Sequence, residues 1–165
     1  MNTSMSARLQ KGFTLIELLV VIGVLAVLLA IVLIAINPAR QFSQANNTKR
    51  ASDVNALLNA IHQYAADNKG NITALGTIST DSSAPTAISS AGIGNAFCTS
   101  LATEYIAALP SDPLTNNGAP VIDTVSCVVG GTWATGYTVY RTASDNRVTV
   151  SAPAAELSAV ISVTR

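Results

Sequence analysis

The sequence predicts an α+β protein in which a long N-terminal helix packs on a small antiparallel β-sheet. Three patterns support this fold class: an uninterrupted apolar run near the start, an apolar stripe of helical period in the middle, and alternating apolar and polar residues in the last third. The chain has 165 residues, which leaves room for one small globular domain after the long helix.

The apolar run is long enough to cross a membrane as a helix. It carries no charged or polar side chain from Leu18 to Ile36 and extends back to Phe13, with one carboxylate, Glu17, near its beginning. A helix of about 20 apolar residues spans the hydrocarbon core of a bilayer. A carboxylate inside such a segment is costly, so Glu17 either needs a partner or reaches the headgroups at the membrane edge.

A short basic segment precedes the apolar run and ends in Lys11 and Gly12. The positive-inside rule places this end in the cytoplasm and the residues after about position 40 on the other side. Arg40, Lys49 and Arg50 also follow the run, so the charge asymmetry is moderate. A secretory signal peptide has an apolar core of about 7–15 residues and is discarded whole. The present run is longer, and we expect it to stay on the mature protein.

A second, amphipathic helical segment is predicted over residues 38–70, after a membrane-spanning segment over 13–37. Its apolar residues recur with the period of a helix, and polar residues occupy the opposite face. The stripe consists of Val54, Leu57, Leu58, Ile61, Tyr64 and Ala65. Gly70 suits the left-handed position after a helix end. Because Pro38 lacks an amide hydrogen, we expect a kink there in one continuous helix, with two separate helices as the alternative.

Residues 71–165 are expected to form the globular part. The stretch 71–94 is rich in Ser, Thr, Ala and Gly and predicts a loop-rich connection, and 96–109 predicts a short helix. Segments with a period of two predict an antiparallel meander. These strands are expected over 121–129, 137–141, 147–152 and 157–164. One face of the sheet should lie on the apolar stripe of the helix.

Residues 11–18 read Lys-Gly-Phe-Thr-Leu-Ile-Glu-Leu and open directly into the apolar run. This arrangement resembles the class III signal of type IV pilins and of the pseudopilins of type II secretion and DNA-uptake systems. In this family a prepilin peptidase cuts after the glycine and methylates the new N-terminal residue. The resemblance therefore implies that residues 1–12 are a leader removed after Gly12, and that Phe13 becomes methylated. It covers 11–36 closely and the next helix loosely.

The resemblance also implies a role for Glu17 and a set of partners. After cleavage, the amine of Phe13 would pair with Glu17 of a neighbouring subunit and set the register of a helical homo-oligomer. The other partners implied are the prepilin peptidase, the membrane platform of the assembly machine, and membrane lipid before assembly. The implied location is the cytoplasmic membrane, with the N-terminus in the cytoplasm, and then an extracellular filament. In many family members a proline lies nearer the glutamate than Pro38 does here, which leaves the kink position open.

Cys98 and Cys127 are the only cysteines of the chain. Both fall in the part expected outside the cytoplasm, where two cysteines most often pair. We expect a disulfide, with two free thiols as the alternative.

Asp112 is a weak candidate for calcium binding. It lies in the stretch from Leu109 to Pro113, which is similar to one that precedes the calcium loop of major pseudopilins. Carboxylate and carbonyl oxygens are ligands that calcium prefers. One or two carboxylates are few ligands for a calcium site, however, and a plain turn is the favoured interpretation.

The sequence does not predict an enzyme or a nucleic-acid-binding protein. It contains one histidine, His62, on the polar side of the predicted helix, and no nucleophile set, phosphate loop or metal-ligand cluster. The formal net charge is zero, so no basic field is available to attract nucleic acid. No cofactor is expected apart from the weak calcium candidate.

Two functional hypotheses follow from these observations. The first is a structural subunit of a type IV pilus, with a pseudopilin of a type II secretion or DNA-uptake system as its close alternative. The second is a membrane-anchored extracytoplasmic binding domain that never polymerises. Gly12, Phe13 and Glu17 favour the first hypothesis, because an ordinary membrane anchor does not need them.

Overall fold

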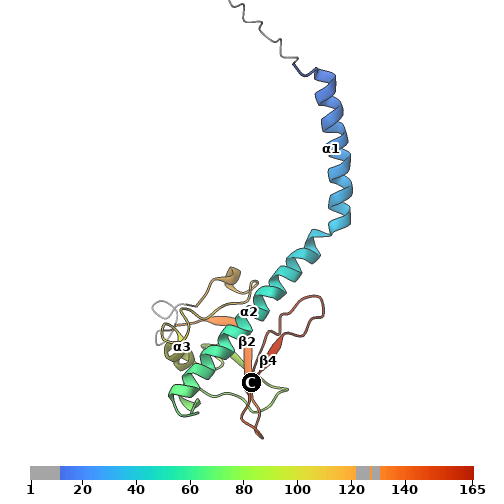
Figure 1. Cartoon of the computed structure of the whole chain (residues 1–165). Helices are drawn as coiled ribbons and strands as arrows, with labels where there is room; N and C mark the ends of the chain where they lie inside the picture. Colours follow the sequence, from blue (N-terminus) through green and yellow to red (C-terminus); the bar gives the residue numbers. More distant parts are fainter. Residues whose placement is uncertain (1–11, 122–126, 128–130) are drawn as a thin grey trace, which may run out of the picture. The chain divides into compact units, whose positions relative to one another are not determined.

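The computed structural model describes residues 12–121, 127 and 131–165 (Figure 1). The chain divides into two compact units, Met1–Gln41 and Phe42–Arg165. The first unit contains the apolar helix. The second contains most of the next helix together with the sheet, and it holds the hydrophobic core.

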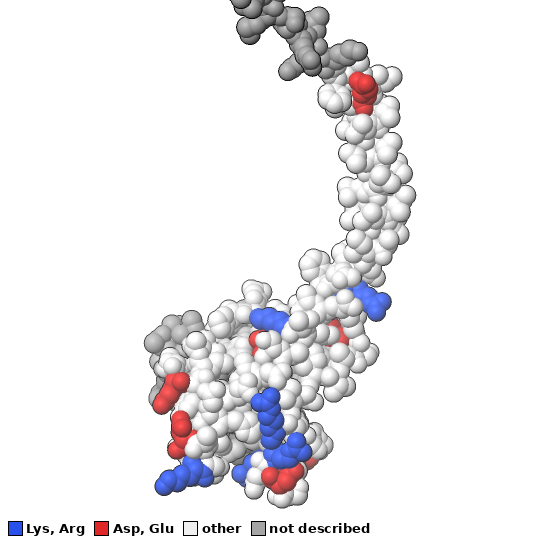
Figure 2. All heavy atoms as spheres, viewed as in Figure 1, with Lys and Arg blue, Asp and Glu red and all other residues white. Residues whose placement is uncertain are grey.

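Helix α1 runs from Leu15 to Ile36 and is apolar on all sides. None of its side chains is buried among the described residues. By length and composition its 22 residues form a candidate membrane span, with a mean hydropathy of 3.5. Figure 2 shows an uncharged surface along this helix apart from one acidic group in its first turn, Glu17. A helix of this kind needs lipid or other apolar helices around it.

Asn37 separates helix α1 from helix α2, which runs from Pro38 to Asp67. Its backbone is left-handed, with φ of 45°, a conformation that asparagine tolerates better than most residues. Pro38 then occupies the first helical position, where its missing amide hydrogen costs nothing. The Asn37 side chain accepts a hydrogen bond from the amide of Arg40 at 3.3 Å. The predicted break position is confirmed, but the predicted continuous helix is wrong, because a left-handed residue ends α1.

The predicted apolar stripe of helix α2 is confirmed. Its members Val54, Leu57, Leu58, Ile61 and Tyr64 are buried, and Ala65 is partly buried against the same core. The helix end is also as predicted: Gly70 is left-handed, with φ of 82°. Its amide donates to the carbonyl oxygen of Ala65 at 2.7 Å, which satisfies one of the last carbonyl groups of the helix.

Four antiparallel strands form one sheet in the order β1-β2-β3-β4. Their bounds are Thr86–Ser89 for β1, Ala134–Arg141 for β2, Val148–Ser151 for β3 and Ser162–Thr164 for β4. The buried side chains of β2 belong to Thr135, Tyr137 and Val139, in strict alternation. The hydroxyl group of Tyr137 donates to the Asp53 carboxylate on α2 at 2.8 Å. One face of the sheet therefore packs on α2, and the α+β fold class is confirmed.

The strands depart from the sequence predictions in two places. Strand β1 lies in the stretch 71–94, which was predicted to be a loop; it has only four residues and its register shifts between Ala87 and Ser89. The strand predicted over 157–164 is confined to Ser162–Thr164, because Leu157 and Ser158 have positive φ values. Most of the strand predicted over 121–129 lies outside the described residues.

Helix α3, Asn95–Leu101, is shorter than the helix predicted over 96–109. It ends because Ala102 is extended and Thr103 has a positive φ of 72°. Two short 3₁₀ helices, Thr73–Leu75 (η1) and Asn116–Gly118 (η2), complete the described elements. Cys98 on α3 forms a disulfide with Cys127, and their Cα atoms are 5.5 Å apart. The disulfide ties α3 to the segment that precedes β2.

Candidate processing and assembly site

The first turn of helix α1 is built by a reciprocal pair of hydrogen bonds between Thr14 and Glu17. The hydroxyl oxygen of Thr14 accepts from the amide of Glu17 at 3.3 Å, and the amide of Thr14 donates to Oε2 of Glu17 at 2.8 Å. The Thr14 hydroxyl also lies 2.8 Å from the same carboxylate oxygen and donates to it. This capping box satisfies amide hydrogens that a helix start leaves without partners.

The capping box places the Glu17 carboxylate next to the residue that follows Gly12. Phe13 precedes the cap residue and is 85% exposed. Together with Ile16, Glu17, Val20 and Val21, it lines a shallow open hollow of about 390 Å³ on α1. The predicted cleavage point, the predicted methylation site and the predicted assembly carboxylate thus share one short stretch of exposed surface.

Only one oxygen of the Glu17 carboxylate is used within the described part of the chain. All of its hydrogen bonds there run to Oε2, and both come from Thr14. Oε1 has no hydrogen-bond partner among the described residues, and no other charged side chain lies on α1. The carboxylate is therefore oriented by its own helix while one oxygen remains available to a cation from outside.

A family model of the prokaryotic N-terminal methylation motif matches residues 7–33. The match covers the end of the basic segment, the Gly12–Phe13 bond and most of α1. Residues 7–33 therefore carry a class III signal of the kind found in type IV pilin-like and pseudopilin-like proteins. Searches of curated proteins and of solved structures gave no significant match. The motif implies processing by a prepilin peptidase and assembly in a pilus-type system, and members of this family are structural subunits.

The other residues predicted for the site lie elsewhere in the pilin-like chain. Cys98 and Cys127 belong to the second unit, Phe42–Arg165, which we call the head, and pair there as expected. Asp112, the weak calcium candidate, also lies in the head and is fully buried. The described residues contain no group of three or more His, Cys, Asp or Glu side chains arranged to hold a metal ion.

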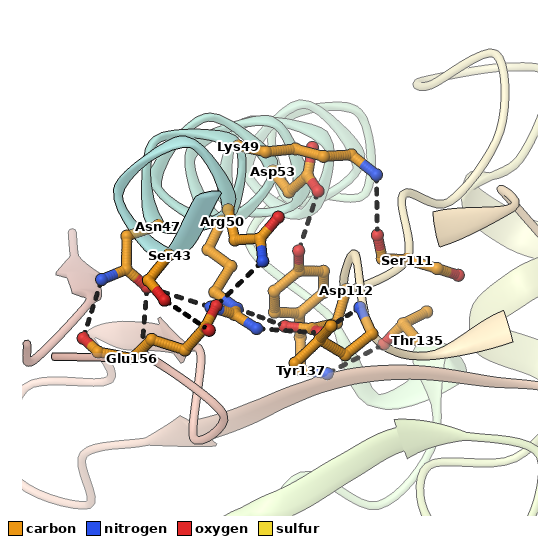
Figure 3. A network of polar contacts seen from close by, with 12 residues as sticks. Ser43, Asn47, Lys49, Arg50, Asp53, Ser111, Asp112, Thr135, Tyr137 and Glu156 are labelled. Atoms are coloured by element: carbon orange, nitrogen blue, oxygen red, sulfur yellow. Dashed lines mark hydrogen bonds and ion pairs between the residues drawn. The ribbon is translucent and has the colours of Figure 1, made fainter. Parts of the chain in front are cut away.

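Asp112 is the partner of a buried arginine (Figure 3). The Nε of Arg50 donates to its Oδ2 at 2.6 Å, and Nη2 donates to its Oδ1 at 3.2 Å. Both carboxylate oxygens therefore face a guanidinium group, whose positive charge opposes a calcium ion at the same oxygens. Asp112 forms an ion pair instead of the suggested calcium site.

Arg50 also binds a second carboxylate, and none of its side chain is exposed. Its Nη1 donates to Oε2 of Glu156 at 2.8 Å and to Oδ1 of Asn47 at 3.0 Å. Hydrogen bonding to Asp112 raises the pKa of Arg50 above its ordinary value, and burial opposes this shift. The guanidinium group joins α2 to two segments that lie 62 and 106 residues further along the chain.

Glu156 is held by four side chains of the first half of α2. Ser43 and Asn46 donate to its two carboxylate oxygens at 2.9 and 3.0 Å, beside the contact from Arg50. Asn47 donates to its backbone carbonyl oxygen and accepts from its amide. Sequence reasoning missed this cluster and treated Arg50 only as a flanking charge. The available signal was its spacing, since Arg50 lies four residues before Val54 and continues the apolar stripe.

A second polar contact between α2 and the sheet lies beside the ion pair (Figure 3). Burial raises the pKa of Asp53, and the hydrogen bond from the Tyr137 hydroxyl group opposes this shift. Burial likewise raises the pKa of Tyr137, and the neighbouring Asp53 carboxylate adds to the rise. Nearby, Nζ of Lys49 donates to the carbonyl oxygen of Ser111 at 3.2 Å. These contacts fix the register between α2 and the segment around Asp112.

Replacing Asp112 by alanine should destabilise the head strongly. The change leaves the buried Arg50 guanidinium without its main partner, and breaking a buried pair in this way costs about 3–5 kcal/mol of unfolding free energy. Chemical unfolding of the detergent-solubilised chain, followed by circular dichroism, measures the loss. As a control, Asp145→Ala in an exposed turn should change stability by no more than about 0.5 kcal/mol. Equal effects of the two changes would contradict the role assigned to Arg50.

The contribution of Glu156 to stability should vanish in acid. Hydrogen bonds from Asn46, Arg50 and Ser43 hold its pKa below the ordinary value of 4.5. A lowered pKa stabilises the folded state above the unfolded pKa, and this contribution is lost as the pH falls through the folded pKa. Glu156→Gln should therefore destabilise the chain at neutral pH. The difference in unfolding free energy between this variant and wild type should shrink as the pH falls below 4.5.

Thermal unfolding of wild type and Glu156→Gln in parallel, from about pH 7 down to about pH 3, measures this difference. The comparison between variants is needed because Asp53 titrates with the opposite sign: its raised pKa favours the folded state in acid. A difference that stays constant over the whole range would be inconsistent with a charged Glu156 acting through its hydrogen bonds.

Proposed function

We propose that this pilin-like chain is a structural subunit of a type IV pilus. It enters the membrane as a prepilin, is cleaved after Gly12, is methylated at Phe13 and polymerises through α1. The observation that carries the proposal is the combination on α1 of an apolar surface on all sides with a single oriented carboxylate, Glu17, directly beside the cleavage point. The leader is residues 1–12, the assembly helix 13–37, the amphipathic helix 38–70 and the remaining globular part 71–165.

The Glu17 carboxylate is energetically costly where it lies on α1. A carboxylate near the edge of a membrane-spanning segment is disfavoured, and it is more strongly disfavoured among packed apolar helices that exclude water. Cleavage after Gly12 creates a cationic amine on Phe13, at the end of a helix where the dipole is already positive. An amine and a carboxylate from neighbouring subunits attract strongly at low dielectric. Each new subunit then adds in the one register that pairs them.

The capping box supports this role because it orients the carboxylate before assembly. Thr14 holds Oε2 of Glu17 and leaves Oε1 available. A side chain that is already fixed loses less conformational entropy when it binds, so the pairing between subunits is stronger than for a freely rotating carboxylate. The same residues therefore start the helix and prepare its contact.

We place a pilus subunit ahead of a pseudopilin because of the head. The resemblance of residues 109–113 to a pseudopilin stretch favours the pseudopilin alternative. Within that stretch, however, Asp112 pairs with Arg50 instead of remaining open to a cation. The disulfide and the buried ion pair brace a head that is exposed on the outside of a filament. A pseudopilin of a secretion or DNA-uptake system remains the second candidate.

The N-terminus of the protein on the cell tests the processing step. Mass spectrometry of the sheared surface fraction should find an N-terminal peptide that begins at Phe13 and is one methyl group heavier than its sequence. The processed peptide in the membrane fraction alone would favour the pseudopilin. A peptide that begins upstream of Gly12 in every fraction would overturn the proposal and favour an anchored module that does not polymerise.

Glu17→Ala should abolish filaments without removing the protein from the membrane. The change deletes the only charged group of α1 and keeps its apolar surface, so insertion is preserved while the pairing with the Phe13 amine is lost. Electron microscopy counts filaments, and immunoblotting of membranes measures the subunit. The matched control is Asp145→Ala, which removes an exposed carboxylate of the head. Normal filament numbers in Glu17→Ala cells would contradict the assembly role.

A further inference from the structure

Arg141 occupies a position of strand β2 that belongs to the core face of the sheet. Thr135, Tyr137 and Val139 precede it at intervals of two and are buried, and side chains at that interval share one face of a strand. Arg141 is the last residue of β2 and lies opposite Val148 of β3. A charged side chain therefore stands at the edge of the apolar layer between the sheet and α2.

Two neighbouring hollows meet at Arg141. One has a volume of about 320 Å³ and is lined by Arg141, Ile72 and Ile78, together with Thr73, Gly76 and Thr77. The other has about 230 Å³ and is lined by Arg141, Ile72 and His62, together with Ile61, Ala65, Gly70, Asn146 and Val148. The two hollows share Arg141 and Ile72 and each contains aliphatic side chains, so Arg141 stands between two spaces whose walls are partly apolar.

Two buried nitrogen atoms at these hollows lack partners. Nε of Arg141 and Nε2 of His62 are both inaccessible to solvent and make no hydrogen bond with the described residues. A buried polar atom without a partner is uncommon in folded proteins and calls for an explanation, such as a functional role or a bound water or ion. The two residues that carry these atoms lie on α2 and β2, and both line the same hollow.

Arg141 has no counter-ion in the described part of the chain. The ion pairs found there both belong to Arg50. The nearest acidic residue along the chain, Asp145, is exposed in the β2–β3 turn and accepts a hydrogen bond from the amide of Arg147 at 3.3 Å. A guanidinium group that has no carboxylate partner, and whose Nε donates no hydrogen bond within the described residues, is set up to bind an anion.

We propose that this place, the Arg141 hollow, binds a small carboxylate ligand with a short apolar body. The guanidinium group of Arg141 takes the carboxylate, since its planar N–H groups match two carboxylate oxygens. Nε2 of His62 donates a further hydrogen bond in the tautomer that carries its hydrogen there. The aliphatic walls from Ile61, Ile72 and Val148 accommodate the apolar body. This site is independent of α1 and of the proposed assembly contact.

Nuclear magnetic resonance of His62 tests the site directly, because it is the only histidine of the chain. The full chain, labelled with ¹⁵N-histidine and solubilised in detergent, is titrated with acetate, butyrate or inorganic phosphate. We expect a saturable shift of the His62 ring signals with both carboxylates. Butyrate should bind more tightly than acetate, by up to about fourfold for each CH₂ group that becomes buried.

Matched variants separate a site from a general charge effect. Arg141→Gln should weaken butyrate binding at least about tenfold, because a charge-assisted pair of hydrogen bonds is lost. Arg141→Lys keeps the charge but not the planar guanidinium group, so its affinity for butyrate should lie between those of wild type and Arg141→Gln. Arg147→Gln removes an exposed charge of the same turn that does not line the hollow, and should bind as wild type does. Circular dichroism verifies that each variant is folded.

Three results would overturn the proposal. The first is the absence of a saturable His62 shift up to about 0.1 M butyrate. The second is that folded Arg141→Gln binds butyrate as tightly as wild type does. If Arg141→Gln does not fold, the same result with Arg141→Lys would overturn the proposal. The third is binding of phosphate or acetate at least as tight as that of butyrate, which removes the role of the apolar walls.

Discussion

One buried arginine in helix α2 holds the head together. Arg50 pairs with Asp112 in the segment between α3 and β2, and with Glu156 in the segment between β3 and β4. Those segments carry little regular structure of their own. Their positions are therefore set by hydrogen bonds to helix α2. The desolvation of the guanidinium group is offset only because its partners all arrive together. Removing either partner would leave a buried charge unpaired, so the pair constrains where these segments can lie.

Helix α1 is governed by a different constraint, which is the lack of any apolar partner within the described chain. Its side chains cannot remain in water, so lipid or other copies of the helix must cover them. The same surface that makes the helix a candidate membrane span also makes it suited to a bundle. Within that surface Glu17 is the only group that can specify direction and register. An apolar helix alone would associate in many registers, and in the proposed filament one oriented carboxylate would reduce that number.

Much of the fold could be predicted because the relevant signals are local. The apolar run, the 54–65 stripe, the helix end at Gly70 and the break at Pro38 each follow from residue types within a few positions of one another. The predictions failed where distant partners decide the outcome. Strand β1 is too short to show a period of its own and is a strand because β2 pairs with it. Asp112 resembled a calcium ligand until the fold placed Arg50 against it.

The sequence by itself determined the signal around Gly12, the length and apolar character that make α1 a candidate membrane span, and the α+β class, because each depends on hydrophobic periodicity or on a contiguous motif. Only the tertiary structure decided that Arg50 is buried between two carboxylates, and that Arg141 and His62 meet at one hollow. The residues of the Arg50 cluster and of the Arg141 hollow lie on elements far apart along the chain. The sequence pattern around a charged residue does not show whether its side chain will be buried with a partner or solvated. Long-range pairing is a property of the folded backbone, and it becomes visible only once the helix and the sheet are in contact.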